Sequence, residues 1–293
     1  MKIAVYGPLF NERSKSTIQT LISYLKRREA RVVFEKNFHA SIASDSDIDL
    51  NAYAFATFEV LDASYDLLIS LGGDGTILRA ITFVKDLEIP IVGINTGRLG
   101  FLATIPMNTV QEAMDEIFEG NYRISKRSLL TIEVDAKNTS LDLDFALNEI
   151  AVSRKNTTSM ISVETWLDSE YLTSYWADGL IVSTPTGSTG YSLSCGGPVI
   201  IPESDSLVLT PIAPHNLNAR PLVISSDKVI KLKVSGREDQ HLVSLDSRIN
   251  TLENNTSITI QKAPFYIHMI ELKEDGFLET LRKKLLWGAD PRN

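Results

Sequence analysis

The sequence predicts two domains, a parallel α/β domain followed by a β-rich, sandwich-like domain. A chain of 293 residues exceeds what one hydrophobic core usually supports. Strand and helix patterns alternate over residues 1–123, whereas apolar residues recur with period two over residues 124–263. A helical pattern returns near the end, so we expect residues 264–293 to pack back on the first domain.

The first domain reads as a Rossmann-like layer of parallel strands covered by helices. Short apolar runs that end at turn-forming residues predict strands at 2–6, 31–35, 67–71 and 89–94. Ile18, Leu21, Ile22 and Leu25 form the buried stripe of a helix. Further helices are expected at 76–84 and from Asn108, with Gln111 three residues later, to Gly120.

The second domain reads as short, mostly antiparallel strands. Turn-formers such as Asp168-Ser169 and Ser235-Gly236 separate these strands, and one helix is expected around Ser188 to Cys195. The closing helix, 277–287, carries Leu278, Leu281 and Leu285 on one side.

Composition excludes several classes of protein. A net charge of −8 and a pI near 5.1 argue against nucleic acid as a partner. The sequence contains neither a secretory signal nor an apolar run of membrane-spanning length, so we expect a cytoplasmic protein without membrane contact. The single cysteine, Cys195, has no nearby histidine in sequence and reads as a small buried residue. The four histidines lack zinc-site spacing, so no metal ligands are assigned.

The segment LLISLGGDGTILRA, residues 67–80, indicates an anion site. A buried strand enters Gly72-Gly73-Asp74-Gly75 and continues into a helix, which places the loop at the carboxyl edge of a parallel sheet. Glycines and free N–H groups at a helix start suit a phosphate, and a carboxylate there indicates a working role for Asp74. The structural alternative is that Asp74 caps the helix. No GxxxxGK[ST] motif is present, and no GxGxxG follows a strand, which argues against a P-loop enzyme and a dinucleotide oxidoreductase.

Two further segments carry polar groups. Hydroxyl side chains crowd the stretch from Ser183 to Ser192, after Asp178, and suit ribose and phosphate oxygens; alternatively they satisfy their own turn. Asn148-Glu149 interrupts the apolar strand FALNEIAV, either as a buried pair that needs partners or as solvated residues of an edge strand.

Together GGDGT (72–76), NTGRLGFL (95–102), LNE (147–149) and DGLIVSTPTGSTGYSLSCGGP (178–198) resemble the NAD kinase family. GGDG alone also occurs in phosphofructokinases and lipid kinases, whereas the four motifs in this order are more specific. The resemblance implies ATP-dependent phosphorylation of the 2′-hydroxyl of the adenosine ribose of NAD, with Mg²⁺ as cofactor. A lipid or sugar-phosphate kinase and a non-catalytic dinucleotide sensor remain alternatives.

The resemblance also implies roles for individual residues. Asp74 matches the catalytic aspartate, and Gly72, Gly73, Asn95 and Gly97 match ATP-binding positions. The resemblance implies that the β-rich domain, residues 124–263, binds NAD. The positions that match NAD contacts are Gly75, Arg79, Asn148, Glu149, Asp178, Thr189, Gly190, Tyr191, Ser192, Leu193, Ser194 and Ala213.

Three positions bear on assembly or depart from the family pattern. Ala213 matches a residue that reaches the NAD site of a neighbouring subunit, which implies a homo-oligomer, commonly a tetramer. Trp176 stands where members often carry a basic residue, and Arg248 where they often carry glutamine, so the local contacts of both are uncertain.

Overall fold

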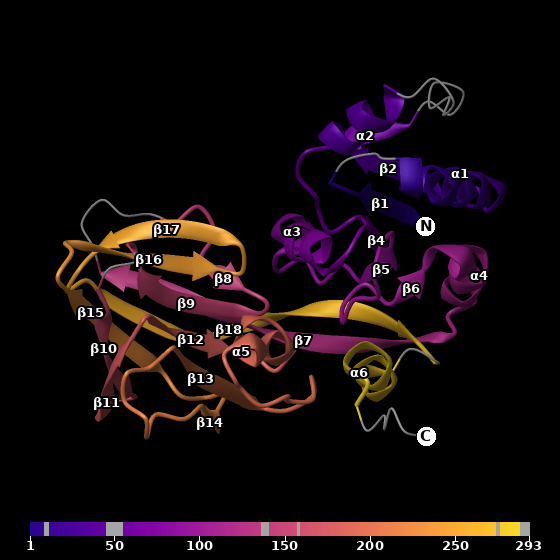
Figure 1. The fold of residues 1–293 in the computed structure, drawn as a ribbon. Helices are drawn as coiled ribbons and strands as arrows, with labels where there is room; N and C mark the ends of the chain where they lie inside the picture. The colour runs from indigo at the N-terminus through magenta and orange to yellow at the C-terminus, as the bar shows by residue number, and fades with distance from the viewer. Residues whose placement is uncertain (9–11, 45–54, 136–140, 157–158, 274–275, 288–293) are drawn as a thin grey trace. The chain divides into compact units, whose positions relative to one another are not determined.

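A computed structural model describes residues 1–8, 12–44, 55–135, 141–156, 159–273 and 276–287. The chain forms two compact units (Figure 1). Unit 1 comprises residues 1–126 and 267–293, and unit 2 comprises residues 127–266. Two strands, β7 (Tyr122–Asp135) and β18 (Ser257–Leu272), contribute residues to both units.

Unit 1 is built on a parallel sheet whose strands run in the order β5-β4-β1-β2-β3. The strands are β1 (Lys2–Tyr6), β2 (Arg31–Glu35), β3 (Ala56–Phe58), β4 (Leu67–Leu71) and β5 (Ile91–Asn95). Every residue of β4 and β5 is buried, as expected for central strands of a sheet covered on both faces. The end of β18 extends the sheet through Met269, and β6 (Ile105–Pro106) pairs with β5.

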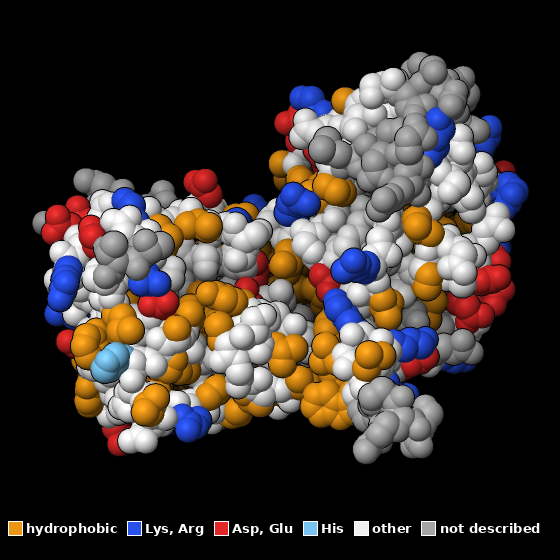
Figure 2. Space-filling view, viewed as in Figure 1, with side chains coloured by type: hydrophobic (Ala, Val, Ile, Leu, Met, Phe, Trp, Pro, Cys, Tyr) orange, Lys and Arg blue, Asp and Glu red, His pale blue; other side chains and the backbone are white. Residues whose placement is uncertain are grey.

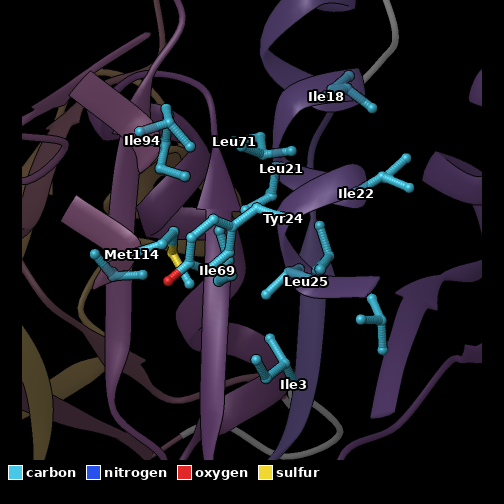
Figure 3. Packing of buried hydrophobic residues seen from close by; sticks show 14 of the residues in the cluster. Ile3, Ile18, Leu21, Ile22, Tyr24, Leu25, Ile69, Leu71, Ile94 and Met114 are labelled. Carbon is cyan, nitrogen blue, oxygen red and sulfur yellow. The ribbon is translucent and has the colours of Figure 1, made fainter. Parts of the chain in front are cut away.

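Helices cover this sheet. They are α1 (Glu12–Arg27), α2 (Lys36–Ala43), α3 (Asp74–Val84), the 3₁₀ turn η2 (Met107–Thr109), α4 (Val110–Glu119) and α6 (Phe277–Leu285). Figure 3 shows the predicted stripe of α1 facing the strands, and Leu21 and Leu25 belong to the same buried cluster as Ile69 and Leu71 of β4. Burial of this stripe is the main source of stability for α1, since an isolated helix of its length is marginal in water.

Unit 2 consists of two antiparallel sheets around a common core. The strands are β8 (Phe145–Ala146), β9 (Glu149–Arg154), β10 (Ile161–Leu167), β11 (Glu170–Ala177), β12 (Gly179–Ser183), β13 (Ser206–Ile212), β14 (Leu222–Ser225), β15 (Ile230–Gly236), β16 (Gln240–Leu245) and β17 (Arg248–Glu253). One sheet has the order β14-β13-β12-β9-β16-β17, and the other contains β11-β10-β15-β18. The 3₁₀ turn η3 (Thr186–Thr189) and α5 (Tyr191–Ser194) follow β12.

The predicted fold class is confirmed, with local corrections. The α4 helix begins at Val110 after a 3₁₀ turn, and no side chain caps it, so the capping pattern predicted at Asn108 is wrong. Ser235-Gly236 ends β15 instead of forming a turn. Of the three leucines placed on one side of the last helix, Leu281 is buried, whereas Leu278 and Leu285 are exposed. Within the described residues, no helix is long and apolar enough to cross a membrane.

His241 on β16 is wholly buried in unit 2, where its Nδ1 lies 3.1 Å from Oδ1 of Asn254. Burial lowers the pKa of His241, because the imidazolium loses its hydration. The folded state therefore binds fewer protons than the unfolded state once the pH falls below about 6.5.

We therefore expect that acidification from pH 7 to pH 5 lowers the free energy of unfolding more in the wild type than in His241→Leu, because only the wild type carries the His241 contribution. Urea denaturation of both proteins at the two pH values measures the difference. If both proteins showed the same change in free energy of unfolding between pH 7 and pH 5, His241 would be protonated as easily in the folded chain as in the unfolded one.

Candidate active site

In unit 1 the candidate residues lie where β4 and β5 end. The two strands are parallel neighbours, with Leu71 opposite Ile94, so their following loops meet at one edge of the sheet. Gly73 is the N-cap of α3 and Asp74 is its first residue. Gly73 and Gly75 are exposed. The N-terminal end of α3 thus presents backbone N–H groups and a positive dipole end to an anion.

The carboxylate of Asp74 accepts hydrogen bonds from three successive backbone N–H groups. Phe101 donates to Oδ2 at 2.8 Å, and Leu102 and Ala103 each donate to Oδ1 at 3.0 Å. The side chain does not bond the N–H groups of its own helix, so the alternative that Asp74 caps α3 is wrong. It instead ties the start of α3 to the loop after β5.

Gly100 makes this arrangement possible. A Cβ atom at position 100 would lie 1.9 Å from Oδ1 of Asp74, closer than non-bonded atoms approach. Any other residue there would displace the carboxylate or the loop. Gly100 belongs to the NTGRLGFL motif, where sequence reasoning gave it no role.

The remaining candidate positions of unit 1, Asn95, Gly97 and Arg79, differ in exposure. Asn95 is buried, and its side chain organises its own loop: Nδ2 donates to the carbonyls of Arg98 and Ala103, and Oδ1 accepts from the N–H of Gly97. Gly97 and Arg79 are exposed, Arg79 on α3 about one turn beyond Gly75. The side chain of Asn95 therefore shapes the loop, and Arg79 is accessible to a ligand.

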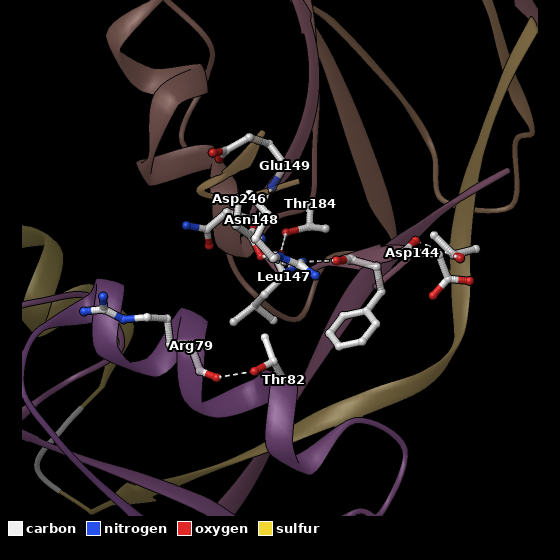
Figure 4. Close-up of polar contacts among 11 residues, drawn as sticks. Arg79, Thr82, Asp144, Leu147, Asn148, Glu149, Thr184 and Asp246 are labelled. Carbon is white, nitrogen blue, oxygen red and sulfur yellow. Dashed lines mark hydrogen bonds and ion pairs between the residues drawn. The ribbon is translucent and has the colours of Figure 1, made fainter. Parts of the chain in front are cut away.

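In unit 2 the LNE segment is held by a second carboxylate. Asp246, in the turn between β16 and β17, accepts from the N–H groups of Leu147 (3.0 Å), Asn148 (2.8 Å) and Glu149 (3.3 Å). Figure 4 shows Asp246 beside these residues, with the hydroxyl of Thr184 bonded to the carbonyl of Leu147. Burial raises the pKa of Asp246, opposed by these N–H groups and by Arg248. Sequence reasoning did not identify Asp246 as a site residue.

Asn148 and Glu149 present buried acceptors. Because β9 lies between β12 and β16, the alternative of an edge strand with solvated side chains is wrong. Within the described residues, Oδ1 of Asn148 and Oε2 of Glu149 are buried without hydrogen-bond partners. Such atoms cost free energy unless a ligand supplies donors, so this pair is a candidate binding site for hydroxyl or amide groups.

The hydroxyl-rich stretch mostly satisfies itself. Ser188 bonds the backbone at Pro185 and Ile200, Thr189 bonds the carbonyl of Thr186, and Ser192 pairs with Thr210. Its backbone, however, lies against the LNE segment. A Cβ at Gly187 would meet the carbonyl oxygen of Asn148 at 2.1 Å, so only glycine permits this approach.

The residues after η3 lie beside the same acceptors. A Cβ at Gly190 would lie 3.3 Å from Oε2 of Glu149, which places Gly190 directly against the unpartnered atom. Tyr191 and Ser194 are exposed, and Leu193 is half-buried. An exposed ring and a close backbone therefore flank the orphaned acceptors.

Three comparisons bear on this arrangement. Residues 9–122 match the model of the ATP-NAD kinase N-terminal domain, and residues 147–272 match that of the ATP-NAD kinase C-terminal domain. The chain is 58% identical to a protein named NAD kinase from Christiangramia forsetii and 54% identical to one from Flavobacterium psychrophilum, covering 100% of both chains in each case. The chain belongs to the NAD kinase family.

Solved structures agree with this assignment. An NAD kinase from Archaeoglobus fulgidus in complex with ATP has a TM-score of 0.74 and 26% identity, and covers 97% of each chain. Yeast NADH kinase complexed with NADH has a TM-score of 0.86 over 99% of this chain and 89% of its own, and at 23% identity it shows the shared fold.

The positions singled out by the NAD kinase resemblance differ in their surroundings. Asp178 forms an ion pair with Arg154, with 2.9 Å between Oδ2 and Nη2. Ala213 is exposed, with a positive φ of 43°. Trp176 is 54% exposed, and its ring packs at a tilt of 43° against His215, with 4.5 Å between the ring centroids. Arg248 bonds the carbonyl of Phe145 and lies 3.8 Å from Asp246, so it supports the LNE segment.

A cation beside Asp74 was missed at the level of sequence. Nζ of Lys284, on α6, lies 3.7 Å from Oδ2 of Asp74 and 4.7 Å from the centroid of the Phe101 ring. The two residues are 210 positions apart, and no local pattern in the closing helix marks Lys284 among its basic neighbours.

Two other kinds of site were considered from the sequence, a cysteine nucleophile and a metal centre. Cys195 is partly buried, and burial raises the pKa of its thiol, which keeps it protonated and a poor nucleophile. No group of three or more metal-binding side chains occurs in the described residues.

Glu149 provides a test of the buried acceptors. Burial raises the pKa of Glu149 to about 8, the charge of Asp246 adds to the shift, and the N–H of Tyr191 opposes it. The folded protein therefore keeps this proton over a pH range in which the unfolded chain has lost it. Stability then decreases as the pH rises through that range, by about 1.4 kcal/mol per pKa unit at full effect.

We expect that raising the pH from 5 to 8 changes the free energy of unfolding less favourably in the wild type than in Glu149→Gln, which cannot ionise and so lacks the Glu149 contribution. Denaturation curves at both pH values provide the measurement. If the two proteins lost the same stability, Glu149 would be ionised at pH 5 and the buried-acceptor model would be wrong.

Proposed function

We propose that this chain is an NAD kinase that transfers the γ-phosphoryl group of ATP to the 2′-hydroxyl of the adenosine ribose of NAD, with Asp74 as general base. The main support for this reaction is the 58% identity, over both full chains, to a protein named NAD kinase. The exposed glycine loop at the start of α3 and the orphaned acceptors of the LNE segment support it, because they suit a phosphate and a ribose.

NAD binds to unit 2 in this proposal. Asn148 and Glu149 accept hydrogen bonds from the adenosine part of NAD, which gives their buried oxygens the donors they lack. The ring of Tyr191 stacks on a base, and the backbone from Thr189 through Gly190 and Ser192 to Leu193 and Ser194 lines the dinucleotide. Asp178 contributes an acceptor, and Ala213 approaches the NAD site of a neighbouring subunit.

ATP binds to unit 1. Gly72 and Gly73 before α3, with Asn95 at the end of β5 and Gly97 in the following loop, form the triphosphate site. The N–H of Gly72 bonds the carbonyl of Ile94 and that of Gly97 bonds Oδ1 of Asn95, so these residues shape the site, and the exposed N-terminal end of α3 supplies free N–H groups. Gly75 and Arg79 on α3 contact NAD. Arg79 is exposed and carries a positive charge suited to the pyrophosphate.

Asp74 acts on the acceptor hydroxyl. Its three N–H donors fix the carboxylate before substrate binds, which lowers the reorganisation needed during reaction. Phosphoryl transfer has a loose transition state, so alignment of the 2′-oxygen with the γ-phosphorus is the main requirement. Asp74 orients the hydroxyl and accepts its proton.

We propose that Mg²⁺ enters with ATP. Mg²⁺ usually retains several waters and binds substrate phosphates with one or two carboxylates. The donor set here fits such a metal, since Asp74 is a carboxylate at the phosphate loop and the described residues contain no preformed metal cluster. When bound, the ion neutralises charge on the phosphate oxygens.

We also propose a cytoplasmic homo-oligomer, and a tetramer by family resemblance. Figure 2 shows hydrophobic side chains on the exposed surface of unit 2. Trp176, which packs against His215, and Leu217 are among the exposed large hydrophobic residues of this unit, and His215 and Leu217 follow the exposed Ala213 in the sequence. Exposed apolar side chains of this size are typical of surfaces that another subunit covers.

Asp74→Asn tests the general base. The substitution keeps the size of the side chain but removes the proton acceptor, so kcat and kcat/KM should fall together by ~10²-fold or more, with little change in NAD affinity. NADP formation from ATP, Mg²⁺ and NAD is the readout. The exposed Asp86→Asn is the matched control and should retain wild-type rates.

The same variant can separate chemistry from stability. An asparagine amide placed against the N–H of Phe101 loses one hydrogen bond, which costs roughly 1–3 kcal/mol of stability. A destabilised Asp74→Asn protein with a normal kcat would make Asp74 a structural residue. Binding of NAD by the wild type without NADP formation would contradict the proposed function itself.

The oligomeric state is tested by measuring the molar mass in solution. Light scattering at micromolar concentration should give a multiple of the 32.5 kDa chain mass. Leu217→Asp should shift the mass towards the monomer, because it places a charge on a surface expected to be covered. A fully active monomer in the wild type would rule out a contribution of Ala213 across subunits.

A further inference from the structure

The C-terminal helix α6 brings a lysine to the candidate catalytic aspartate within unit 1. Nζ of Lys284 lies 3.7 Å from Oδ2 of Asp74, and the Lys284 side chain is 34% exposed. The ammonium also lies over the ring of Phe101, which adds a favourable cation–π contact. Lys284 is thus held at the phosphate loop while remaining accessible to a ligand.

Two aromatic rings and a buried turn fix α6 in this place. The ring of Phe277, at the start of α6, packs against the ring of Phe101 at 6.1 Å between centroids. Thr280 and Leu281 in the middle of the helix are buried. Phe101 also donates its backbone N–H to Asp74, so a single residue connects the helix, the loop and the carboxylate.

The hydrogen bonds of Asp74 leave the ammonium of Lys284 available. Both carboxylate oxygens already accept backbone N–H groups, and 3.7 Å exceeds the length of a hydrogen bond. Among the described residues, no acceptor bonds the ammonium of Lys284. The adjacent Lys283 differs, because its Nζ lies 2.7 Å from Oε1 of Glu279 in an ion pair within the helix.

We propose that Lys284 binds the phosphoryl group that is transferred from ATP. The inference rests on the proposed function and adds to it a cation from the C-terminal helix. A lysine ammonium offers three donors and a point charge suited to phosphate oxygens. Its distance from Asp74 is short enough for both groups to act on the same reacting centre, Asp74 on the hydroxyl and Lys284 on the phosphoryl oxygens.

The step balances without a change in the charge of Lys284. The ribose 2′-oxygen forms a bond to the γ-phosphorus, and the bond from that phosphorus to the β,γ-bridging oxygen breaks. ADP leaves with the electron pair, and the hydroxyl proton passes to Asp74. Lys284 remains protonated and stabilises the negative charge on the phosphoryl oxygens.

The test compares Lys284→Met with Lys283→Met on the same helix. We expect Lys284→Met to lower kcat/KM for ATP by about 10–100-fold, the range for loss of a hydrogen bond to a charged group, with KM for NAD little changed. Lys283→Met should match the wild type. Lys284→Arg keeps the charge and should recover most of the rate. Thermal unfolding of each variant checks that α6 remains docked.

Each contrary outcome has a distinct meaning. Wild-type kinetics in Lys284→Met would overturn the inference, and a faster variant would mean that Lys284 holds the free enzyme inactive. A lower unfolding temperature with normal turnover, or failure of Lys284→Arg to recover activity, would indicate a structural role. If the wild type formed no NADP, the proposed function would fail, and calorimetric titration of wild type and Lys284→Met with ATP would still decide whether Lys284 binds phosphate.

Discussion

The candidate residues of each unit depend on one kind of interaction, a carboxylate that accepts hydrogen bonds from three successive backbone N–H groups. Asp74 holds residues 101–103 in unit 1, and Asp246 holds residues 147–149 in unit 2. A charged acceptor strengthens each bond, and three bonds fix both the side chain and the loop. The positions of the loops after β5 and before β9 follow from these two carboxylates.

The two carboxylates differ in what they leave accessible. The Asp246 side chain is almost fully buried, and its hydrogen bonds go to the backbone of the LNE segment. Asp74 is partly exposed at the start of α3, so the same anchoring can serve a ligand. In unit 2 the unpartnered oxygens of Asn148 and Glu149 are among the buried atoms without hydrogen bonds, and Asp246 positions both residues through their backbone. In unit 2, therefore, Asp246 anchors the backbone while Asn148 and Glu149 are the candidate binding groups. In unit 1 the single residue Asp74 has both roles.

Local patterns predicted the fold class because periodicity and buried runs reflect local geometry. The strands at Lys2–Tyr6, Arg31–Glu35 and Leu67–Leu71 were predicted to the residue. The assignments of individual site residues remain predictions. Asp246, Gly100 and Lys284 escaped sequence reasoning because their roles arise from contacts with residues 99, 26 and 210 positions away, as in Asp246 with Leu147. At the hydroxyl-rich stretch the sequence left two readings open, and the structure shows several of its hydroxyls in internal hydrogen bonds.

The return of residues 267–293 to unit 1 has a consequence for synthesis of the protein. The ribosome makes residues 1–126 first, but the strand that pairs beside β5 and the helix that reaches Asp74 are made last. Until then the start of β5 lacks its partner strand, since β6 pairs only with the end of β5, and an unpaired strand edge is prone to wrong pairing. A chain cut short before residue 267 would therefore carry the GGDG loop without the helix that brings Lys284 to Asp74.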